Sequence, residues 1–262
     1  PGLSTGLPDV DMAISGLNKS DLILLAARPG MGKTSFALNM LLHAGKFSGK
    51  TVVFFSLEMS REQLAMRLIS GESFVDNKKL VTGKLGEEDW TKIAAASAAL
   101  NQTQILIDDN PSLSVADMNA KCRRVDNLGL VVIDYLQLMS STKNYNGNRV
   151  VEISDITRNL KIMAKELNVP VITLSQLARG PEQRPDKRPL LSDLRESGSI
   201  EQDADIVMFL YRNAYYDKTD PNVNACECIV AKNRHGEPGT VPLGWDGEFT
   251  RFTNAEFVRQ EN

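Results

Sequence analysis

The sequence predicts one α/β domain built on a mostly parallel sheet, with antiparallel strands added near its C-terminus. Apolar runs alternate with helical patterns along most of the chain, which is typical of a parallel sheet covered by helices on both faces. The tail changes to strand patterns separated by turn residues. A length of 262 residues is sufficient for one large domain with a full core.

The elements in the first half of the chain are predicted from the spacing of hydrophobic residues and from the residues that begin and end helices. The apolar run at 21–27 ends in a Pro/Gly loop, so it is predicted as a buried strand with a helix after it. Ser60, with Gln63 three residues later, forms a capping-box pattern that predicts a helix start. The predicted elements are strand 21–27, helix 34–46, strand 51–56, helix 60–71, helix 87–100, strand 104–108, helix 114–127 and strand 130–135.

The second half begins with a long amphipathic helix that Asn168 and Pro170 close. The Asp246-Gly247 pair between the last two strands is a hairpin turn signal. Two polar stretches are predicted as mobile loops, at 140–149 and 180–189. The remaining predicted elements are helix 150–167, buried strands 171–175 and 205–211, and antiparallel strands 226–231, 240–245 and 248–253.

Composition and charge limit the function classes. The net charge is −3, whereas a protein whose whole surface grips nucleic acid is usually basic. Positive charge for such a partner would be concentrated locally, and the arginine-rich, proline-flanked segment 179–195 is the candidate. Cys122, Cys226 and Cys228 form neither a disulfide framework nor a spaced metal set, so reduced thiols in a cytoplasmic protein are predicted. No apolar run is long enough to span a bilayer, and no signal peptide opens the chain.

The segment 27–34 reads Ala-Arg-Pro-Gly-Met-Gly-Lys-Thr and lies between a predicted strand and a predicted helix, the context of a phosphate-binding loop. Gly30 and Gly32 let the backbone curl its N–H groups inward, and the helix adds its positive N-terminal end. We expect Lys33 to reach the β- and γ-phosphates and the Thr34 hydroxyl to ligate Mg²⁺. Ala27 stands where the usual pattern has glycine, which leaves these contacts unaffected. Binding of Mg·ATP is therefore predicted for Arg28, Pro29, Gly30, Met31, Gly32, Lys33, Thr34 and Ser35.

Three polar residues end or follow predicted buried strands and are expected at the carboxyl edge of the sheet, where ligands bind. Asp134 is predicted to hold Mg²⁺ through water. Glu58 is predicted to orient and deprotonate the attacking water, the alternative being that it only starts the next helix. Gln176 is predicted to sense the γ-phosphate by hydrogen bonding, the alternative being a surface amide.

Four segments carry a resemblance to a known family. They are Arg-Pro-Gly-Met-Gly-Lys-Thr at 28–34, Phe-Ser-Leu-Glu-Met-Ser at 55–60, Val-Ile-Asp-Tyr-Leu-Gln at 132–137 and Asp-Leu-Arg-Glu-Ser-Gly-Ser-Ile-Glu-Gln-Asp-Ala-Asp at 193–205. With these segments the chain resembles the motor domain of the bacterial replicative DNA helicases, the DnaB family. The resemblance implies a RecA-like P-loop ATPase that uses ATP and Mg²⁺. It also implies a homo-hexameric ring that encircles single-stranded DNA, moves 5′ to 3′ along it and unwinds the duplex during replication.

The resemblance implies roles for single residues as well. It makes Glu58 the catalytic base and Gln176 the sensor. It assigns the DNA backbone to Arg195, Glu196 and Gly198, with Glu196 acting through its main chain because its carboxylate would repel phosphate. The alternative for these three residues is a helix N-cap with a solvated face.

Lys232 and Arg234 follow from the same resemblance. Both are implied to enter the ATP site of the next subunit, with Arg234 as the arginine finger. The alternative is a solvated turn at the end of a strand hairpin. Arg67 is implied to support the γ-phosphate, and a structural salt bridge is the alternative.

We expect a single domain over residues 1–262, as a C-terminal fragment of a longer chain, because the chain begins with Pro1 and the family's N-terminal collar and linker helix are absent. The resemblance implies a helicase loader and primase as partners of the full-length protein, and no membrane. Two other readings stay open. A RecA-like timing or recombination ATPase shares the fold but leaves 193–205 unexplained. A small-molecule kinase would need an acceptor pocket and lid that no segment provides.

Overall fold

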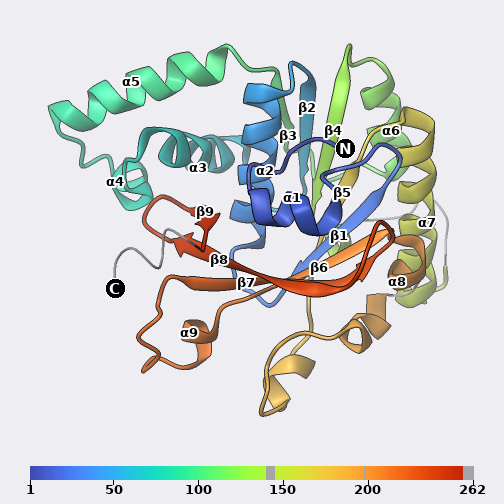
Figure 1. The fold of residues 1–262 in the computed structure, drawn as a ribbon. Coiled ribbons are helices and arrows are strands. Elements are labelled where there is room, and N and C mark those ends of the chain that lie inside the picture. Colours follow the sequence, from blue (N-terminus) through green and yellow to red (C-terminus); the bar gives the residue numbers. More distant parts are fainter. Residues whose placement is uncertain (140–144, 198, 256–262) are drawn as a thin grey trace.

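A nine-stranded sheet organises the residues that the computed structural model describes, which are 1–139, 145–197 and 199–255 (Figure 1). Its strand order is β3-β2-β4-β5-β1-β6-β7-β8-β9. Neighbours from β3 to β6 are parallel, and β7, β8 and β9 add antiparallel to that edge. The predicted fold class is therefore confirmed. The strands are β1 (Leu22–Ala27), β2 (Thr51–Ser56), β3 (Ile105–Asp108), β4 (Leu128–Asp134), β5 (Val171–Gln176), β6 (Ile206–Tyr211), β7 (Ala225–Asn233), β8 (Gly239–Asp246) and β9 (Arg251–Asn254).

Helices cover both faces of this sheet. They are α1 (Pro8–Ile14), α2 (Lys33–Phe47), α3 (Arg61–Ser73), α4 (Asn77–Thr82), α5 (Glu87–Asn101), α6 (Val115–Arg123), α7 (Arg149–Leu167), α8 (Ile200–Asp203) and α9 (Asn213–Tyr216), with 3-10 turns η1 (Leu136–Leu138), η2 (Gly180–Gln183) and η3 (Leu191–Ser197). One apolar cluster joins α1, α2 and α3 to the sheet, and a second joins α6 and α7 to the opposite face. Along β1, Ile23 and Leu25 enter the first cluster while Leu22 and Leu24 enter the second, because successive side chains of a strand point to opposite faces.

The register of the parallel strands decides which strand ends meet. Ala27, the last residue of β1, lies beside Gln176 of β5, and Ser56 of β2 lies beside Asp134 of β4. Since parallel strands share one direction, the segments that follow all four strands leave from the same edge. This carboxyl edge carries the phosphate loop and the polar residues predicted to act with it.

The predicted capping box is confirmed in detail. The Ser60 hydroxyl accepts a hydrogen bond from the Gln63 amide (3.3 Å), and the Ser60 amide donates to Gln63 Oε1 (2.9 Å), so the capping box starts α3. Along β7, buried Cys226 and Cys228 lie on one face with Val230 in the first apolar cluster. All three cysteines are free.

Other local predictions differ from the structure. The helix predicted at 114–127 ends at Arg123, and Asn127 adopts a positive φ of 55°, which a continued helix does not allow. The last strand starts at Arg251 rather than at 248, because residues 247–250 form the turn after Asp246. The short helices α1, α4, α8 and α9 were not predicted, since four to seven residues carry too little helical period. The predicted loop 180–189 contains η2, and 140–144 of the other predicted loop lie outside the described residues.

Candidate nucleotide site

The loop between β1 and α2 has the backbone that a phosphate cradle needs. Gly30 and Gly32 have φ angles of 83° and 93°, in the left-handed region that favours glycine. A Cβ on Gly30 would lie 2.7 Å from Tyr215 Cε2, and a Cβ on Gly32 would lie 2.9 Å from Phe252 Cζ. No side chain caps the start of α2, so its first amides remain available to an anion.

A buried cluster of Lys33, Thr34 and Asp134 lies directly under this loop. Thr34 Oγ1 donates to Asp134 Oδ2 (2.8 Å), and Lys33 Nζ is 3.2 Å from Asp134 Oδ1. Asp134 is fully buried at the end of β4. Hydroxyl and carboxylate oxygens are the ligands that Mg²⁺ prefers, so the predicted metal residues are close enough to serve one ion together. Lys33 Nζ also lies 4.6 Å from the centroid of the Tyr135 ring.

A cavity of about 340 Å³ opens over the loop, and it brings most of the predicted catalytic residues together. Glu58 and Gln176 line it from the ends of β2 and β5. Arg67 of α3 lines it as well and donates to Ser35 Oγ (3.4 Å). Its lining residues are Arg28, Pro29, Gly30, Gly32, Lys33, Thr34, Ser35, Glu58, Arg67, Gln176, Trp245 and Thr250.

The electrostatics of this cavity follow from burial and from two carboxylates. Burial lowers the pKa of Arg67 from its ordinary value, and the negative charges of Asp134 and Glu58 oppose that shift. Burial raises the pKa of the Tyr135 hydroxyl, and the same two carboxylates raise it further. Lys33 and Arg67 both line the space above the loop, and the Glu58 side chain lines it with them.

Sequence reasoning missed the part of the cavity wall that the C-terminal strands supply. Trp245 of β8 and Thr250 of the β8–β9 turn line the cavity. Arg212 directly follows β6, donates to the Gly30 carbonyl (3.1 Å) and lies 5.2 Å from the Trp245 ring centroid. Burial lowers the pKa of Arg212 from its ordinary value. The strand-end rule that singled out Gln176 would also have found Arg212, whereas Trp245 reaches the cavity only because β8 is placed by sheet pairing.

Arg28 connects the phosphate loop to the segment after β5. Its guanidinium donates to Glu182 Oε1 (2.8 Å) and to the Leu177 carbonyl (2.6 Å). Tyr216 donates to the same Glu182 oxygen (3.3 Å), and the Arg28 guanidinium holds the pKa of Glu182 below its usual range. Arg28 therefore ties the start of the phosphate loop to the segment that follows β5.

Lys232 and Arg234 lie at the amino ends of the parallel strands, opposite the carboxyl edge that carries the phosphate loop. Because β7 runs antiparallel to β6, its last residues stand beside the amino end of β6, where Asn233 pairs with Ile206. Lys232 Nζ donates to the Glu201 carbonyl (2.7 Å), and Arg234 donates to Asp205 Oδ1 (2.9 Å) with 61% of its side chain exposed. Neither residue lines the nucleotide cavity of its own chain.

The arginine-rich segment 179–195 carries less free positive charge than its composition suggests. Arg184 forms two hydrogen bonds to Asp193 (2.8 and 2.9 Å), and Arg188 pairs with Glu227 (3.0 Å). Arg195 and Glu196 belong to η3, but their side chains and all of Gly198 lie outside the described residues. Their predicted contacts with DNA therefore stay predictions.

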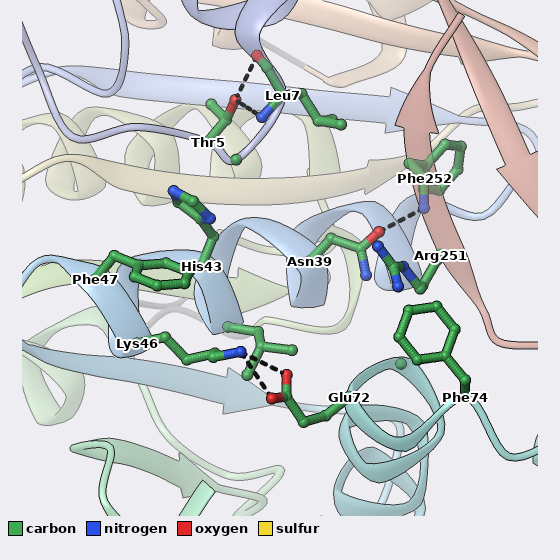
Figure 2. A pocket seen from close by; sticks show the side chains of 13 residues that line it. Thr5, Leu7, Asn39, His43, Lys46, Phe47, Glu72, Phe74, Arg251 and Phe252 are labelled. Atoms are coloured by element: carbon green, nitrogen blue, oxygen red, sulfur yellow. Dashed lines mark hydrogen bonds and ion pairs between the residues drawn. The ribbon is translucent and has the colours of Figure 1, made fainter. Parts of the chain in front are cut away.

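A separate groove of about 340 Å³ lies along the C-terminal half of α2 (Figure 2). Lys46 of α2 donates to Glu72 of α3 across its floor (2.7 and 3.0 Å), and the backbone amide of Phe252 donates to Asn39. The exposed rings of Phe47 and Phe74 flank it. Apart from Phe252, whose edge closes on Gly32, the groove shares no residue with the nucleotide site.

Two absences hold for residues 1–139, 145–197 and 199–255. No group of three or more His, Cys, Asp or Glu side chains is placed to hold a metal ion. No helix combines the length and the apolar character required to cross a bilayer.

The sheet and the loop–helix cradle at its carboxyl edge define a RecA-like P-loop domain. Its fold resembles that of the RadB recombinase with a TM-score of 0.60 at 17% identity over 96% of this chain and 99% of the other, a likeness of fold alone. Residues 2–254 match the model of the DnaB-like helicase C terminal domain, and the chain belongs to that family.

Known proteins of the family resemble this chain closely. It is 51% identical to the replicative DNA helicase DnaB of Geobacillus stearothermophilus and 50% identical to the replicative DNA helicase DnaC of Bacillus subtilis (strain 168), in each case over 97% of this chain. The chain spans 57% of the length of both relatives. Among solved structures, one described as an ATPase domain matches with a TM-score of 0.92 and 41% identity over 97% of this chain and 91% of that one.

Proposed function

We propose that this chain is the ATP-hydrolysing motor domain of a replicative DNA helicase, and that it couples Mg·ATP hydrolysis to 5′–3′ movement on single-stranded DNA and duplex unwinding. One observation supports this best. The cavity holds a phosphate loop, an acid and a sensor amide, while the two cations that would complete it lie at the far edge of the same sheet. A site divided in this way becomes complete only between neighbouring copies of the chain.

In this proposal the phosphate loop binds the triphosphate. The loop amides and the start of α2 surround the phosphates, and Lys33 leaves its partner Asp134 to reach the β- and γ-oxygens. Thr34 and Asp134 would hold Mg²⁺, Asp134 through water, and the bound ion would supply positive charge beside the phosphates. Trp245, whose ring Arg212 contacts, supplies the aromatic part of the cavity wall, and the adenine is assigned to it.

Hydrolysis is assigned to Glu58 and Gln176. The Glu58 carboxylate orients a water and accepts its proton as the water oxygen attacks the γ-phosphorus, and the bond from that phosphorus to the β–γ bridging oxygen breaks to release ADP. Glu58 is exposed at the mouth of the cavity, so a water reaches it freely. Gln176 donates to a γ-phosphate oxygen, and Arg67 adds positive charge nearby.

The neighbouring subunit supplies Lys232 and Arg234. The Arg234 guanidinium donates to Asp205, and most of the Arg234 side chain is exposed. It is therefore available to stabilise the charge that develops on the transferring phosphoryl group in the next copy. A closed ring, here a homo-hexamer, is the assembly in which every loop meets such a residue.

Contacts with the DNA backbone are assigned to Arg195, Glu196 and Gly198, with Glu196 using its main chain. Contacts with the DNA backbone do not depend on the base sequence, as a translocating motor requires. The solved DnaB-like helicase that resembles this chain at 41% identity, with a TM-score of 0.92 over 97% of this chain and 62% of that one, is described with its interactions with primase. Primase is therefore proposed as a partner of the full-length protein. A helicase loader and a cytoplasmic location are proposed from the family resemblance alone.

Mixed assemblies test the divided site. Lys33→Ala removes the loop lysine and Arg234→Ala removes the finger, so each variant alone is expected to lose ATP turnover. In an equimolar mixture about one quarter of the interfaces pair an intact loop with an intact finger, so turnover recovers to that order. The control mixes Lys33→Ala with the doubly substituted chain, which forms no complete interface.

The measurement is ATP hydrolysis at ring-forming concentration, with and without single-stranded DNA. Recovery in the mixture but not in the control, together with stimulation by DNA, supports the proposal. Turnover by Lys33→Ala alone would contradict the assignment of the loop, and no recovery in a mixture that still assembles would contradict the divided site.

A further inference from the structure

The side chain of Gln137 joins the ends of two neighbouring strands. Gln137 lies in η1, which follows β4. Its Nε2 donates to Ser175 Oγ (2.7 Å) and to the Gln176 carbonyl (3.0 Å), and its Oε1 accepts from the Gln176 amide (3.1 Å). The ladder between β4 and β5 stops at Ile133 and Thr173, so this amide takes the place that β4 would have filled beside Gln176.

The backbone of Gln137 is held in turn by the start of α7. Arg149, the first residue of that helix, donates to the Gln137 carbonyl (2.5 Å) and forms an ion pair with Glu152 one turn on. A short chain of contacts therefore leads from the first turn of α7 through Gln137 to Gln176. Each contact is a hydrogen bond or an ion pair between described residues.

Gln137 itself stands outside the nucleotide cavity. It lines a second cavity of about 400 Å³ on the other side of Gln176, together with Tyr135 and Arg179. Gln176 and Arg28 line both cavities, so they form the boundary between them. A residue in this place does not touch a bound triphosphate, but it controls where the backbone of Gln176 stands.

We propose that Gln137 is a positioning residue that couples Gln176 to the first turn of α7, so that occupation of the nucleotide cavity is transmitted to Arg149. The coupling rests on the proposed binding of ATP in that cavity. A glutamine suits the position because its side-chain amide can donate to the carbonyl of Gln176 and accept from the N–H of the same residue. Glutamate keeps an acceptor there but loses both donors, and it places a negative charge against the Gln176 carbonyl.

Two variants separate coupling from simple support of the strand. Gln137→Ala removes all three side-chain bonds, and Gln137→Glu removes the two that it donates. Each is expected to bind ATP within about two-fold of wild type, since no phosphate contact is lost, but to hydrolyse it roughly 10- to 100-fold more slowly because Gln176 is misplaced. Gln102→Ala, at an exposed glutamine after α5, is the matched control and keeps wild-type rates.

Affinity and coupling are measured separately from turnover. The chain has two tryptophans, so in a Trp90→Phe background the fluorescence of Trp245 in the cavity wall reports ATP binding. Hydrogen exchange of the amides at 149–153 is followed with and without a non-hydrolysable ATP analogue. Wild type is expected to change its exchange there when the analogue binds, and Gln137→Ala to lose that change.

Arg149→Ala tests the same link from the helix end, without altering either strand. In this variant, hydrogen exchange of the amides that follow residue 149 is expected no longer to change when the analogue binds. Arg158→Ala, at an exposed arginine on the same helix, is the control and retains the change.

The outcomes distinguish the coupling from the function on which it rests. If Gln137→Ala loses affinity and turnover in parallel, or keeps the nucleotide-dependent change, the coupling is wrong while ATP hydrolysis stands. If wild type gives no Trp245 response and no turnover, the assignment of the cavity to ATP fails and the coupling fails with it.

Discussion

At the scale of single residues, the nucleotide site depends on charges that are placed before any ligand arrives. Asp134 is buried with Lys33 and Thr34 as partners, so its carboxylate is already paired at the end of β4. Breaking that pair is the first consequence of phosphate binding in the proposed function. An uncompensated buried carboxylate is costly, which explains why lysine and aspartate occupy the site together.

Glu58→Gln is the residue-scale prediction. The variant retains the shape and hydrogen-bonding capacity of the side chain but cannot accept a proton, so we expect near-normal ATP affinity and turnover lowered by roughly 10²- to 10⁴-fold. Nucleotide binding by Trp245 fluorescence and phosphate release measure the two effects. Glu62→Gln, at an exposed acid in the first turn of α3, serves as control. Normal hydrolysis by Glu58→Gln would refute its assignment as the base.

At the scale of elements, the helix starts decide how well the site is held. α2 begins without a side-chain cap, which in the proposed function leaves its first amides for phosphate, whereas α3 begins with a complete capping box. Glu58 lies three residues before α3, so the capped helix start stands close to it in the chain. The start of α3 is therefore stabilised by its own side chains, whereas the first amides of α2 stay available to a ligand.

Ser60→Ala is the prediction at this scale. It removes the hydroxyl that caps the Gln63 amide, so the free energy of unfolding is expected to fall by about 0.5–2 kcal/mol. Urea unfolding followed by circular dichroism measures the change. Ser112→Ala, in an exposed loop, is the control and should fall within about 0.5 kcal/mol of wild type. If both variants are equally stable, the capping box contributes nothing to α3.

At the scale of the whole molecule, the two halves of the proposed site face away from each other. The phosphate loop leaves the carboxyl edge of the sheet, and Lys232 and Arg234 leave the amino edge through an antiparallel pair of strands. A sheet is rigid, so no small motion brings these groups together within one chain. The proposed activity is accordingly a property of the assembly.

Turnover per chain is therefore predicted to depend on protein concentration. Hydrolysis per molecule should rise as subunits associate and then level off, because each new interface completes one site. Arg234→Ala should lose this rise yet retain ATP binding at its own loop. Measuring hydrolysis over a concentration series alongside the mass in solution checks both. A rate per chain that stays constant from monomer to assembly would contradict the divided site.

The sequence alone predicted the order of the strands and the phosphate loop, because both are marked by residues close together in the chain. Apolar period marked the parallel strands, and Gly30, Gly32 and Lys33 marked the phosphate loop within eight residues. The carboxyl-edge rule then placed Glu58 and Gln176 at one cavity, as the structure has them. The sequence did not predict the short helices or the exact ends of some elements, because few residues there carry the periodic pattern of apolar side chains.

Only the tertiary structure decided which distant segments meet at that cavity. Strand pairing, not local pattern, brings Trp245 and Thr250 over the loop from the far end of the chain. The same pairing sends Arg234 to the opposite edge and sets Gln137 between two strand ends. Hydrophobic period indicates that a strand is buried, but the order of strands follows from packing across the whole sheet, and that order decides which side chains share a site.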